Sequence, residues 1–220
     1  MISNVGWVMV VDGKEENQYE SDEWRLEDIV FSPDSNHLAY IAGDKYRTPE
    51  HRHFIVLDGE ESDVCKESSY YKLIFSQDGN RLAVGGNNFI RVDSVEEVVH
   101  SNLSIKSFVF SPDSTRYAYR DIKQAWLSDS GISAMWVVVD GVKGKQYKGV
   151  SDIAFSPDSK HVSYFARDGE YESIVVDDTR KEYEKVSPIV WDSSDRFHYL
   201  AWKSNNVYLV EETITQRDGD

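Results

Sequence analysis

Short apolar runs separated by polar turns dominate this chain. Runs of about three to five β-branched and aromatic residues recur along it, and Asp, Gly, Ser and Pro separate them. Runs of this length and composition predict β-strands joined by tight turns. Residues 137–139 and 174–176 are apolar at consecutive positions, so we expect both faces of their sheets to be covered.

One block of sequence recurs in five places. Residues 29–35 form an apolar run that ends in Phe31 and Ser-Pro-Asp-Ser, and residues 37–41 form the next run. Pro presets φ in a tight turn, and Asp can bond to its own backbone, so the block predicts a β-hairpin of strands A and B. Further copies begin at Leu73, Phe108, Ile153 and, in degraded form, Ile189.

A second block alternates with the first and predicts a third strand, C. Its copies share an apolar run that ends in Asp-Gly or a similar pair: 7–13, 54–59, 89–94, 136–141, 173–178 and, more loosely, 206–211. The recurrent aspartates suggest a calcium site or a catalytic pair of carboxylates. Their regular placement in every copy of the block favours turn capping instead. They are Asp12, Asp58, Asp93, Asp140 and Asp177.

The two blocks together predict a propeller blade. Tyr19, Tyr147 and Tyr183 fall where a short outer strand D would follow strand C. Four antiparallel strands in roughly 35 to 45 residues are the size of a blade. We therefore expect an all-β fold: a single β-propeller domain over 1–220 with about five four-stranded blades. A parallel β-helix fits less well, because its coils are shorter and lack a fixed hairpin turn.

Closure of the ring has two interpretations. The chain opens on a C-type strand and also ends on one. The N-terminal segment could lie beside the C-terminal strands and close five blades. Alternatively, a sixth blade stays incomplete, or a second molecule completes an open edge, which native proteins normally protect. We expect the closed, monomeric form.

The turn sequences resemble a known repeat. Phe-Ser-Pro-Asp at 110–113 and 155–158, before strands like Leu-Ala-Tyr at 38–40, resembles the WD40-like repeat of the TolB family. The non-catalytic propellers of prolyl-oligopeptidase-type enzymes carry the same repeat. The resemblance spans about 7–210 and implies the fold, while function stays open. Gln77 in place of the turn proline is one departure, and the blurred copy at 192–195 is another.

Composition and charge narrow the partners and the compartment. A formal net charge of −15 argues against nucleic acid or an anionic membrane as the main partner. Cys65 is the single cysteine, which excludes an intrachain disulfide. No apolar stretch is long enough to cross a bilayer, and the first residues lack signal-peptide features. We expect a cytoplasmic protein, or a periplasmic or secreted one if a signal was removed.

Linear motifs of catalysis and cofactor binding are missing. The chain has no Gly-x-Ser-x-Gly elbow and no Walker, dinucleotide-binding or His-Glu-x-x-His pattern. His51 and His53 flank Arg52, and two histidines without a third ligand do not predict a metal site. We therefore predict no catalytic residue, no cofactor, no metal and no enzyme activity.

Two long B-to-C loops suggest where binding occurs. They span about 43–53 and 121–135, whereas the equivalent loop of blade two is only 85–88. Loops on a rigid scaffold often carry binding residues, and exposed Tyr, Trp and Arg anchor protein interfaces. The candidate partner-binding residues are Tyr46, Arg47, His51, Arg52, His53, Lys123, Trp126 and Leu127.

The sequence thus predicts a non-enzymatic scaffold that binds a protein or peptide on its long-loop face. The first alternative is a propeller that binds a small ligand or glycan. This alternative predicts similar pockets between successive blades, and unequal loops count against it. The second is an enzyme with Asp and His residues at the mouth of the channel, which converging groups with perturbed pKa values would reveal.

Overall fold

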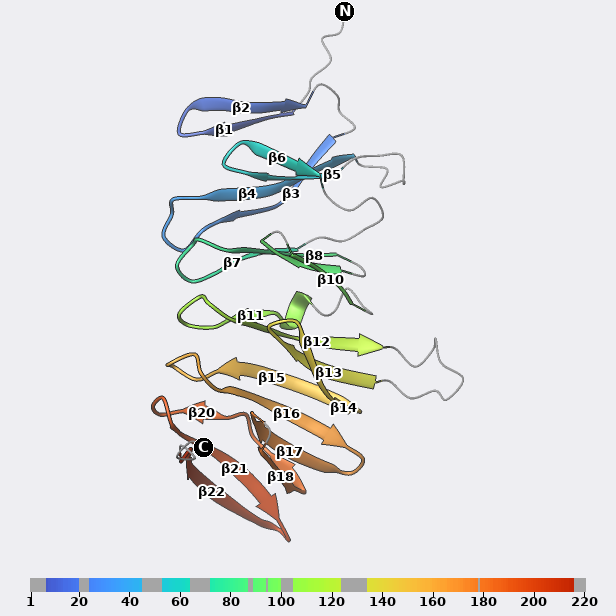
Figure 1. Ribbon diagram of the computed structural model, residues 1–220, viewed down its shortest axis with the longest axis vertical. Helices are drawn as coiled ribbons and strands as arrows, with labels where there is room; N and C mark the ends of the chain where they lie inside the picture. The colour runs from blue at the N-terminus through green and yellow to red at the C-terminus, as the bar shows by residue number, and fades with distance from the viewer. Residues whose placement is uncertain are drawn as a thin grey trace, which may run out of the picture. The chain divides into compact units, whose positions relative to one another are not determined.

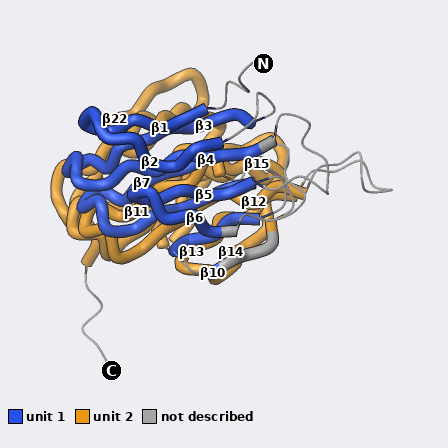
Figure 2. Tube along the Cα trace, turned by 90° about the horizontal axis from the view of Figure 1, so that it is seen from above, with its two compact units in different colours: residues 1–96 blue, residues 97–220 orange. Residues whose placement is uncertain are grey.

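A computed structural model describes residues 7–19, 24–44, 53–63, 72–86, 89–93, 95–99, 105–123, 134–177 and 179–215. The chain divides into two compact units, residues 1–96 and 97–220, which Figure 2 colours separately. Each unit is described below by itself. The expectation of a single domain over 1–220 stays a prediction.

The first unit consists of antiparallel sheets that follow one another along the chain (Figure 1). A two-stranded sheet comprises β1 (Trp7–Val11) and β2 (Lys14–Tyr19). The next sheet comprises β3 (Trp24–Phe31), β4 (Leu38–Asp44), β5 (His53–Leu57) and β6 (Glu60–Asp63). A further sheet comprises β7 (Lys72–Phe75), β8 (Leu82–Gly85), β9 (Phe89–Val92) and β10 (Val95–Val98). The boundary between the two units falls within β10.

The second unit continues the same arrangement after a short 3-10 helix, η1 (Ile105–Ser107). Its first sheet comprises β11 (Val109–Phe110), β12 (Tyr117–Lys123), β13 (Ala134–Val139) and β14 (Val142–Tyr147). The second comprises β15 (Gly149–Phe155), β16 (Val162–Asp168), β17 (Tyr171–Val176) and β18 (Thr179–Tyr183). The last comprises β19 (Lys185–Val186), β20 (Val190–Trp191), β21 (Arg196–Lys203) and β22 (Asn206–Thr213).

Four of these sheets have the predicted A-B-C-D order. In the sheet β3-β4-β5-β6, for example, each strand pairs with its sequence neighbour and β6 lies at the outer edge. The all-β class and the four-stranded antiparallel blade are therefore confirmed. The predicted outer strands end at the expected tyrosines, Tyr19, Tyr147 and Tyr183. Closure of a five-bladed ring stays a prediction.

The last sheet departs from this order. Strands β19 and β20 pair with opposite ends of β21, so together they occupy the place of strand A. Strand β22 pairs along the whole of β21 and is strand C. Within the described residues this sheet has no strand D, whereas β1 and β2 form a C-D hairpin that has no strands A and B.

The A-to-B turn is held by its own serine and aspartate. The Ser32 hydroxyl donates to the Asp34 carboxylate (2.5 Å) and accepts from the His37 backbone N–H (2.9 Å). Asp34 also accepts from the Asn36 N–H, and Ser35 adopts a positive φ of 63°. Ser76 and Asp78 repeat this bond at 2.6 Å, so Gln77 in place of proline leaves the turn intact.

These turns lower the pKa of their aspartates. Hydrogen bonds from the Ser111 hydroxyl and the Thr115 backbone lower the pKa of Asp113 to about 2. The Ser32 hydroxyl likewise lowers the pKa of Asp34. Each bond favours the ionised carboxylate, so the turns are best held when these aspartates are charged.

The C-to-D turns need left-handed backbone. Asp58 and Gly59 have φ values of 52° and 82°, as a two-residue turn between twisted strands requires. Asp140 and Gly141 also have positive φ values, 49° and 79°. Asp tolerates this conformation better than most residues, and Gly adopts it without steric cost.

Buried apolar residues from neighbouring sheets form the cores. In the first unit, one cluster joins Ala39, Ile41 and Ile55 of one sheet to Leu73, Val84 and Phe89 of the next. In the second unit, a cluster joins Ile174 and Val176 to Phe197, Tyr199 and Ala201. The second residue of strand B is a fully buried alanine at Ala39, Ala83 and Ala118, which leaves little room there for a larger side chain.

Tyrosines of strand D also pack against strand B of the following sheet. The Tyr183 and Tyr199 hydroxyl oxygens lie 2.8 Å apart, and Tyr199 donates to Glu212 at 2.5 Å. Burial raises the pKa of Tyr199, and the hydrogen bond to Glu212 adds to this shift. Tyr147 and Tyr164 meet edge to face at 6.0 Å in the preceding pair of sheets. The sheets are therefore joined by neutral phenols as well as by aliphatic side chains.

The first cluster gives a stability prediction. Leu73 is 2% exposed, so Leu73→Ala should lower the free energy of unfolding by about 2–5 kcal/mol. Val142 is 72% exposed, and Val142→Ala should change it by less than about 0.5 kcal/mol. Urea unfolding followed by circular dichroism measures both. Equal effects of the two substitutions would show that the sheets do not pack through Leu73.

Candidate functional site

A carboxylate at the end of strand C holds the start of strand B in four sheets. Asp58 accepts from the Leu38 backbone N–H at 2.9 Å and from His37 Nδ1 at 2.6 Å. Asp177 bonds the Val162 N–H and His161 in the same way. Asp93 and Asp140 instead pair with an arginine, Arg81 at 3.0 Å and Arg116 at 2.8 Å.

In three of these pairs the cation also contacts an aromatic ring of the following sheet. His37 stacks on Phe75 with ring centroids 6.4 Å apart, and His161 stacks on Trp191 at the same distance. The Arg116 guanidinium lies 5.4 Å from the centre of the Phe155 ring. We call this group of aspartate, cation and aromatic ring the interstrand clasp.

The clasp explains the recurrent aspartates. The sequence analysis expected these aspartates to cap their own turns, but the backbone N–H that each accepts belongs to the start of strand B, 11 to 23 residues earlier. The sequence analysis did not identify the aspartate partners of His37 and His161. The recurrence of His or Arg immediately before strand B was the available signal. Because arginine can take the same place, we interpret each histidine as a hydrogen-bond partner that holds the aspartate rather than as half of a catalytic dyad.

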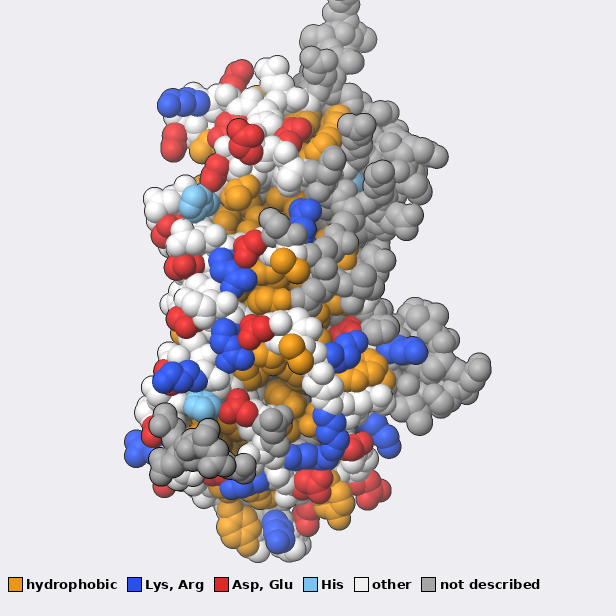
Figure 3. All heavy atoms as spheres, viewed as in Figure 1, with side chains coloured by type: hydrophobic (Ala, Val, Ile, Leu, Met, Phe, Trp, Pro, Cys, Tyr) orange, Lys and Arg blue, Asp and Glu red, His pale blue; other side chains and the backbone are white. Residues whose placement is uncertain are grey.

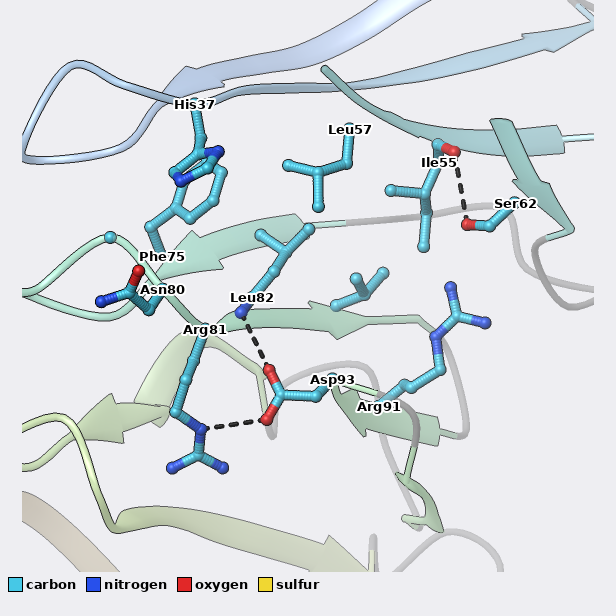
Figure 4. A pocket seen from close by; sticks show the side chains of 12 residues that line it. His37, Ile55, Leu57, Ser62, Phe75, Asn80, Arg81, Leu82, Arg91 and Asp93 are labelled. Carbon is cyan, nitrogen blue, oxygen red and sulfur yellow. Dashed lines mark hydrogen bonds and ion pairs between the residues drawn. The ribbon is translucent and has the colours of Figure 1, made fainter. Parts of the chain in front are cut away.

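A cavity of about 390 Å³ opens beside the first clasp, between the sheets β3–β6 and β7–β10 (Figure 4). Its walls are Ile55 and Leu57 from one sheet and Phe75, Leu82 and Val84 from the next. The volume lies in the range typical of small-molecule sites, and apolar walls with a few polar groups are their usual composition. The remaining lining residues are His37, Ser62, Gly79, Asn80, Arg81, Arg91 and Asp93.

Polar groups stand at both ends of this cavity. His37 and Asn80 lie at the end near Phe75, while Arg91 and Ser62 lie at the other end (Figure 4). The Arg91 side chain rises from β9 toward the strands that carry Ile55 and Ser62 (Figure 4). Arg81 instead turns toward Asp93, which it binds through Nε. Arg91 therefore places a guanidinium at the end of the cavity that Ile55 and Ser62 line.

The charge of the cavity differs from that of the whole chain. The formal net charge is −15, yet the lining contains Arg81, Arg91 and His37 against one carboxylate, Asp93. The hydrogen bond to Asp58 raises the pKa of His37, which favours the imidazolium form. On the face shown in Figure 3, basic and acidic side chains lie interspersed. The cavity thus combines apolar walls with three basic side chains, of which His37 and Arg81 are paired with Asp58 and Asp93.

Most of the predicted loop residues cannot be placed in a site. Tyr46, Arg47, His51, Arg52, Trp126 and Leu127 lie outside the described residues. His53 begins β5, opposite Gly43, where its ring covers the glycine and leaves no room for a Cβ. Lys123 is exposed at the end of β12.

The predicted loop limits were also slightly too wide. Gly43 lies within β4 and Asp121 within β12. Asp121 is 1% exposed and binds Lys143 at 2.8 Å, so it is part of the sheet rather than of a binding loop. Apolar periodicity marks the middle of a strand better than its end, because strand pairing continues through polar residues.

Metal and membrane sites were also sought in the described part of the chain. Its His, Cys, Asp and Glu side chains form no group that could hold a metal ion. None of its helical structure is long and apolar enough to cross a membrane.

Comparison with known proteins identifies similar arrangements of sheets. No protein-family profile and no curated protein sequence matches this chain. An oligogalacturonate lyase in complex with manganese is 10% identical with a TM-score of 0.45, over 97% of this chain and 73% of the lyase. TolB from Acinetobacter baumannii is 13% identical with a TM-score of 0.37, over 94% of this chain and 57% of TolB. An acylaminoacyl peptidase from Pyrococcus horikoshii is 16% identical with a TM-score of 0.45, over 88% of this chain and 39% of the peptidase.

These similarities concern the fold alone. TolB and the propeller domain of a trilobed protease from Pyrococcus furiosus are among the similar structures, in agreement with a TolB-like propeller. No family profile confirms the finer resemblance to the WD40-like family. The chain spans 57% of TolB and 39% of the peptidase.

One prediction from the sequence is wrong in the light of these comparisons. A non-enzymatic scaffold for proteins or peptides was expected, yet several of the similar structures are enzymes, among them the lyase, acylaminoacyl peptidase and prolyl endopeptidases. The prediction rested on the composition of the long loops and on the lack of linear catalytic motifs. Neither observation separates a scaffold from a propeller that occurs in an enzyme.

The clasp gives a prediction about pH. Because the pKa of His37 is raised, its ion pair stabilises the fold fully below pH ~6.5 and less as the pH rises through the raised value. The urea midpoint of the wild type should therefore fall over this range relative to that of His37→Arg. NMR titration should also show a lower His37 pKa in Asp58→Asn than in the wild type. An unchanged His37 pKa in that variant would contradict the clasp.

A second prediction separates the clasp from a catalytic dyad. His161→Arg should change the free energy of unfolding by less than about 0.5 kcal/mol, because Arg116 fills the equivalent place. Asp177→Ala should cost about 1–2 kcal/mol, because the Val162 N–H loses its acceptor. Asp177→Asn keeps an oxygen at that position and serves as the control. A loss of more than about 1.5 kcal/mol in His161→Arg would contradict the equivalence of the two cations.

Proposed function

We propose that this chain binds a small organic anion with an apolar body in the cavity between the sheets β3–β6 and β7–β10. The observation that carries the proposal is the combination of apolar walls with Arg91 at one end of about 390 Å³ of space. This cavity is distinct from the long loops on which the sequence analysis had placed binding.

The walls support an apolar body for the ligand. Ile55 and Val84 are each 3% exposed and belong to the buried cluster between the two sheets. Leu57, Phe75 and Leu82 are only partly buried against that cluster. A ligand that covers them removes apolar surface from water, which contributes roughly 25 cal/mol per Å².

The charge supports an anionic group on the ligand. A carboxylate beside Arg91 would accept charge-assisted hydrogen bonds, which are stronger than bonds between neutral groups. Ser62 lies at the same end, and its hydroxyl donates to the Ile55 carbonyl at 3.3 Å. A cationic ligand would instead meet Arg91 and, at the other end, His37.

The contacts of the residues that line the cavity favour a binding role over a catalytic one. His37 is held by Asp58 and stacked on Phe75, as its counterpart His161 is held by Asp177 and stacked on Trp191. A histidine that repeats in this way along the sheets serves the fold. Arg81 is likewise engaged by Asp93. Arg91 and Ser62 would then orient the ligand.

The test is binding of a panel of phenylalkanoates and medium-chain fatty acids, followed by amide NMR shifts and calorimetry. Carboxylates should bind, and their matched alcohols and amines should bind at least about tenfold more weakly, because the charge-assisted bond contributes about 1.5–3 kcal/mol. Arg91→Gln should weaken carboxylate binding by a similar factor, and Leu82→Trp should abolish it by filling the cavity. Arg25→Gln, an exposed position away from the cavity, is the control.

Two results would contradict the proposal. In the first, amines and alcohols bind as tightly as the carboxylates do. In the second, no member of the panel shifts the amide signals of the cavity residues in the wild type. Equal binding to wild type and Leu82→Trp would show that the ligand occupies another part of the chain.

A further inference from the structure

One pair of residues that lie opposite each other on strands B and C recurs in four of the sheets. A tyrosine stands three residues after the His or Arg at the start of strand B, and the residue opposite it on strand C is a valine. The pairs are Tyr40 with Val56, Tyr119 with Val138, Tyr164 with Val175, and Tyr199 with Val210. Directly opposite residues of an antiparallel pair lie on the same face of the sheet.

The tyrosine of this pair fills space between its own sheet and the preceding one. Tyr199 belongs to a buried cluster with Ile174 of the preceding sheet, and Tyr164 meets Tyr147 of the preceding sheet edge to face. Tyr40 and Tyr199 are among the largest fully buried side chains of the described residues. A phenol ring is therefore the ordinary filling of this place.

The sheet β7–β10 departs from the pattern at both positions of the pair. Val84 stands in the place of the tyrosine, and Arg91 lies opposite it in the place of the valine. Val84 packs in a buried cluster with Ile55 of the preceding sheet, and Arg91 rises toward that same sheet (Figure 4). Compared with the other sheets, this pair lacks one aromatic ring and carries one additional guanidinium. Both residues line the cavity of about 390 Å³.

The walls of the cavity also match the surroundings of a buried tyrosine. Ile174 and Val176 belong to the cluster that holds Tyr199. Ile55 and Leu57 line the cavity and hold the same places in their own strand C, because Leu57 directly precedes a clasp aspartate, as Val176 does. The cavity is therefore walled like a place that holds a phenol ring in another pair of sheets.

We propose that the ligand is an aromatic carboxylate, whose ring occupies the place that Val84 leaves and whose carboxylate binds Arg91. This inference rests on the proposed anion site and specifies the body of the ligand. A tyrosine side chain is a ring on one methylene group, so the space that it fills elsewhere suits a phenyl or phenol group. Val84 and Arg91 are then the residues that determine specificity, the first by leaving room for the ring and the second by binding the charge.

The first test compares two carboxylates with the same number of carbon atoms, 3-phenylpropanoate and nonanoate. Calorimetry should give 3-phenylpropanoate a dissociation constant at least about tenfold lower, because a rigid ring loses less conformational freedom on binding than an alkyl chain does. Adsorption to exposed apolar surface predicts the opposite order, because the alkyl chain is the more apolar body. Equal or tighter binding of nonanoate would overturn the aromatic ligand and leave the anion site in place.

The second test restores the missing tyrosine. Val84→Tyr should weaken binding of 3-phenylpropanoate at least about tenfold by filling the place of the ring. Val84→Tyr combined with Arg91→Val recreates the Tyr–Val pair that four sheets already accommodate, and it should abolish binding. Val142→Tyr makes the same change at a residue that is 72% exposed and should bind as the wild type does. Unchanged binding in the two folded Val84 variants, verified by circular dichroism, would overturn the inference.

The third test separates the place of the ring from the anion site. The probe is p-cresol, the tyrosine side chain as a free neutral molecule, and apolar cavities of sufficient size bind small aromatic molecules. It should shift the amide NMR signals of residues 82–84 in the wild type but not in Val84→Tyr. Absence of this shift in the wild type would overturn the inference even if carboxylates bind. A shift by p-cresol without binding of any carboxylate would support the place for the ring and contradict the anion site.

Discussion

The carboxylate at the end of strand C is the constraint on which the repeat depends. Asp58 turns the chain with a positive φ, accepts the first backbone N–H of strand B and binds the cation beside it. The ring of that histidine stacks on Phe75 of the following sheet. One residue thus joins the C-to-D turn, the A-to-B turn and the packing between sheets. Its loss would disturb all three together, which explains why aspartate recurs at this place.

The same arrangement determines where the chain can bind a ligand. Beside the His37–Phe75 contact, the short side chains of Leu57, Leu82 and Val84 leave a cavity, and the alternation along β9 directs Arg91 toward it. The site therefore comes from an ordinary part of the scaffold, with one cation added to apolar walls. Its chemistry is suited to holding an anion.

Sequence reasoning identified the strands but misjudged the function. The Ser-Pro-Asp-Ser turns and the Asp-Gly pairs have local causes, so 29–35 and 54–59 revealed the A, B and C strands without any tertiary information. Binding was assigned to the long loops by composition, although most of those residues lie outside the described structure. The cavity residues could not be found in this way. Arg91 looks like any polar residue of a strand until the neighbouring sheet is placed opposite it.

The sequence by itself determined the all-β class and the four-stranded repeat, because strands and tight turns follow from contacts between residues close in the chain. Only the tertiary structure decided that His37 binds Asp58, that Phe75 stacks on His37 and that Leu82 and Arg91 share a cavity. It also decided that β19 and β20 share the place of strand A in the last sheet. These features depend on which side chains two sheets bring together, and packing between sheets leaves no periodic signal in the sequence.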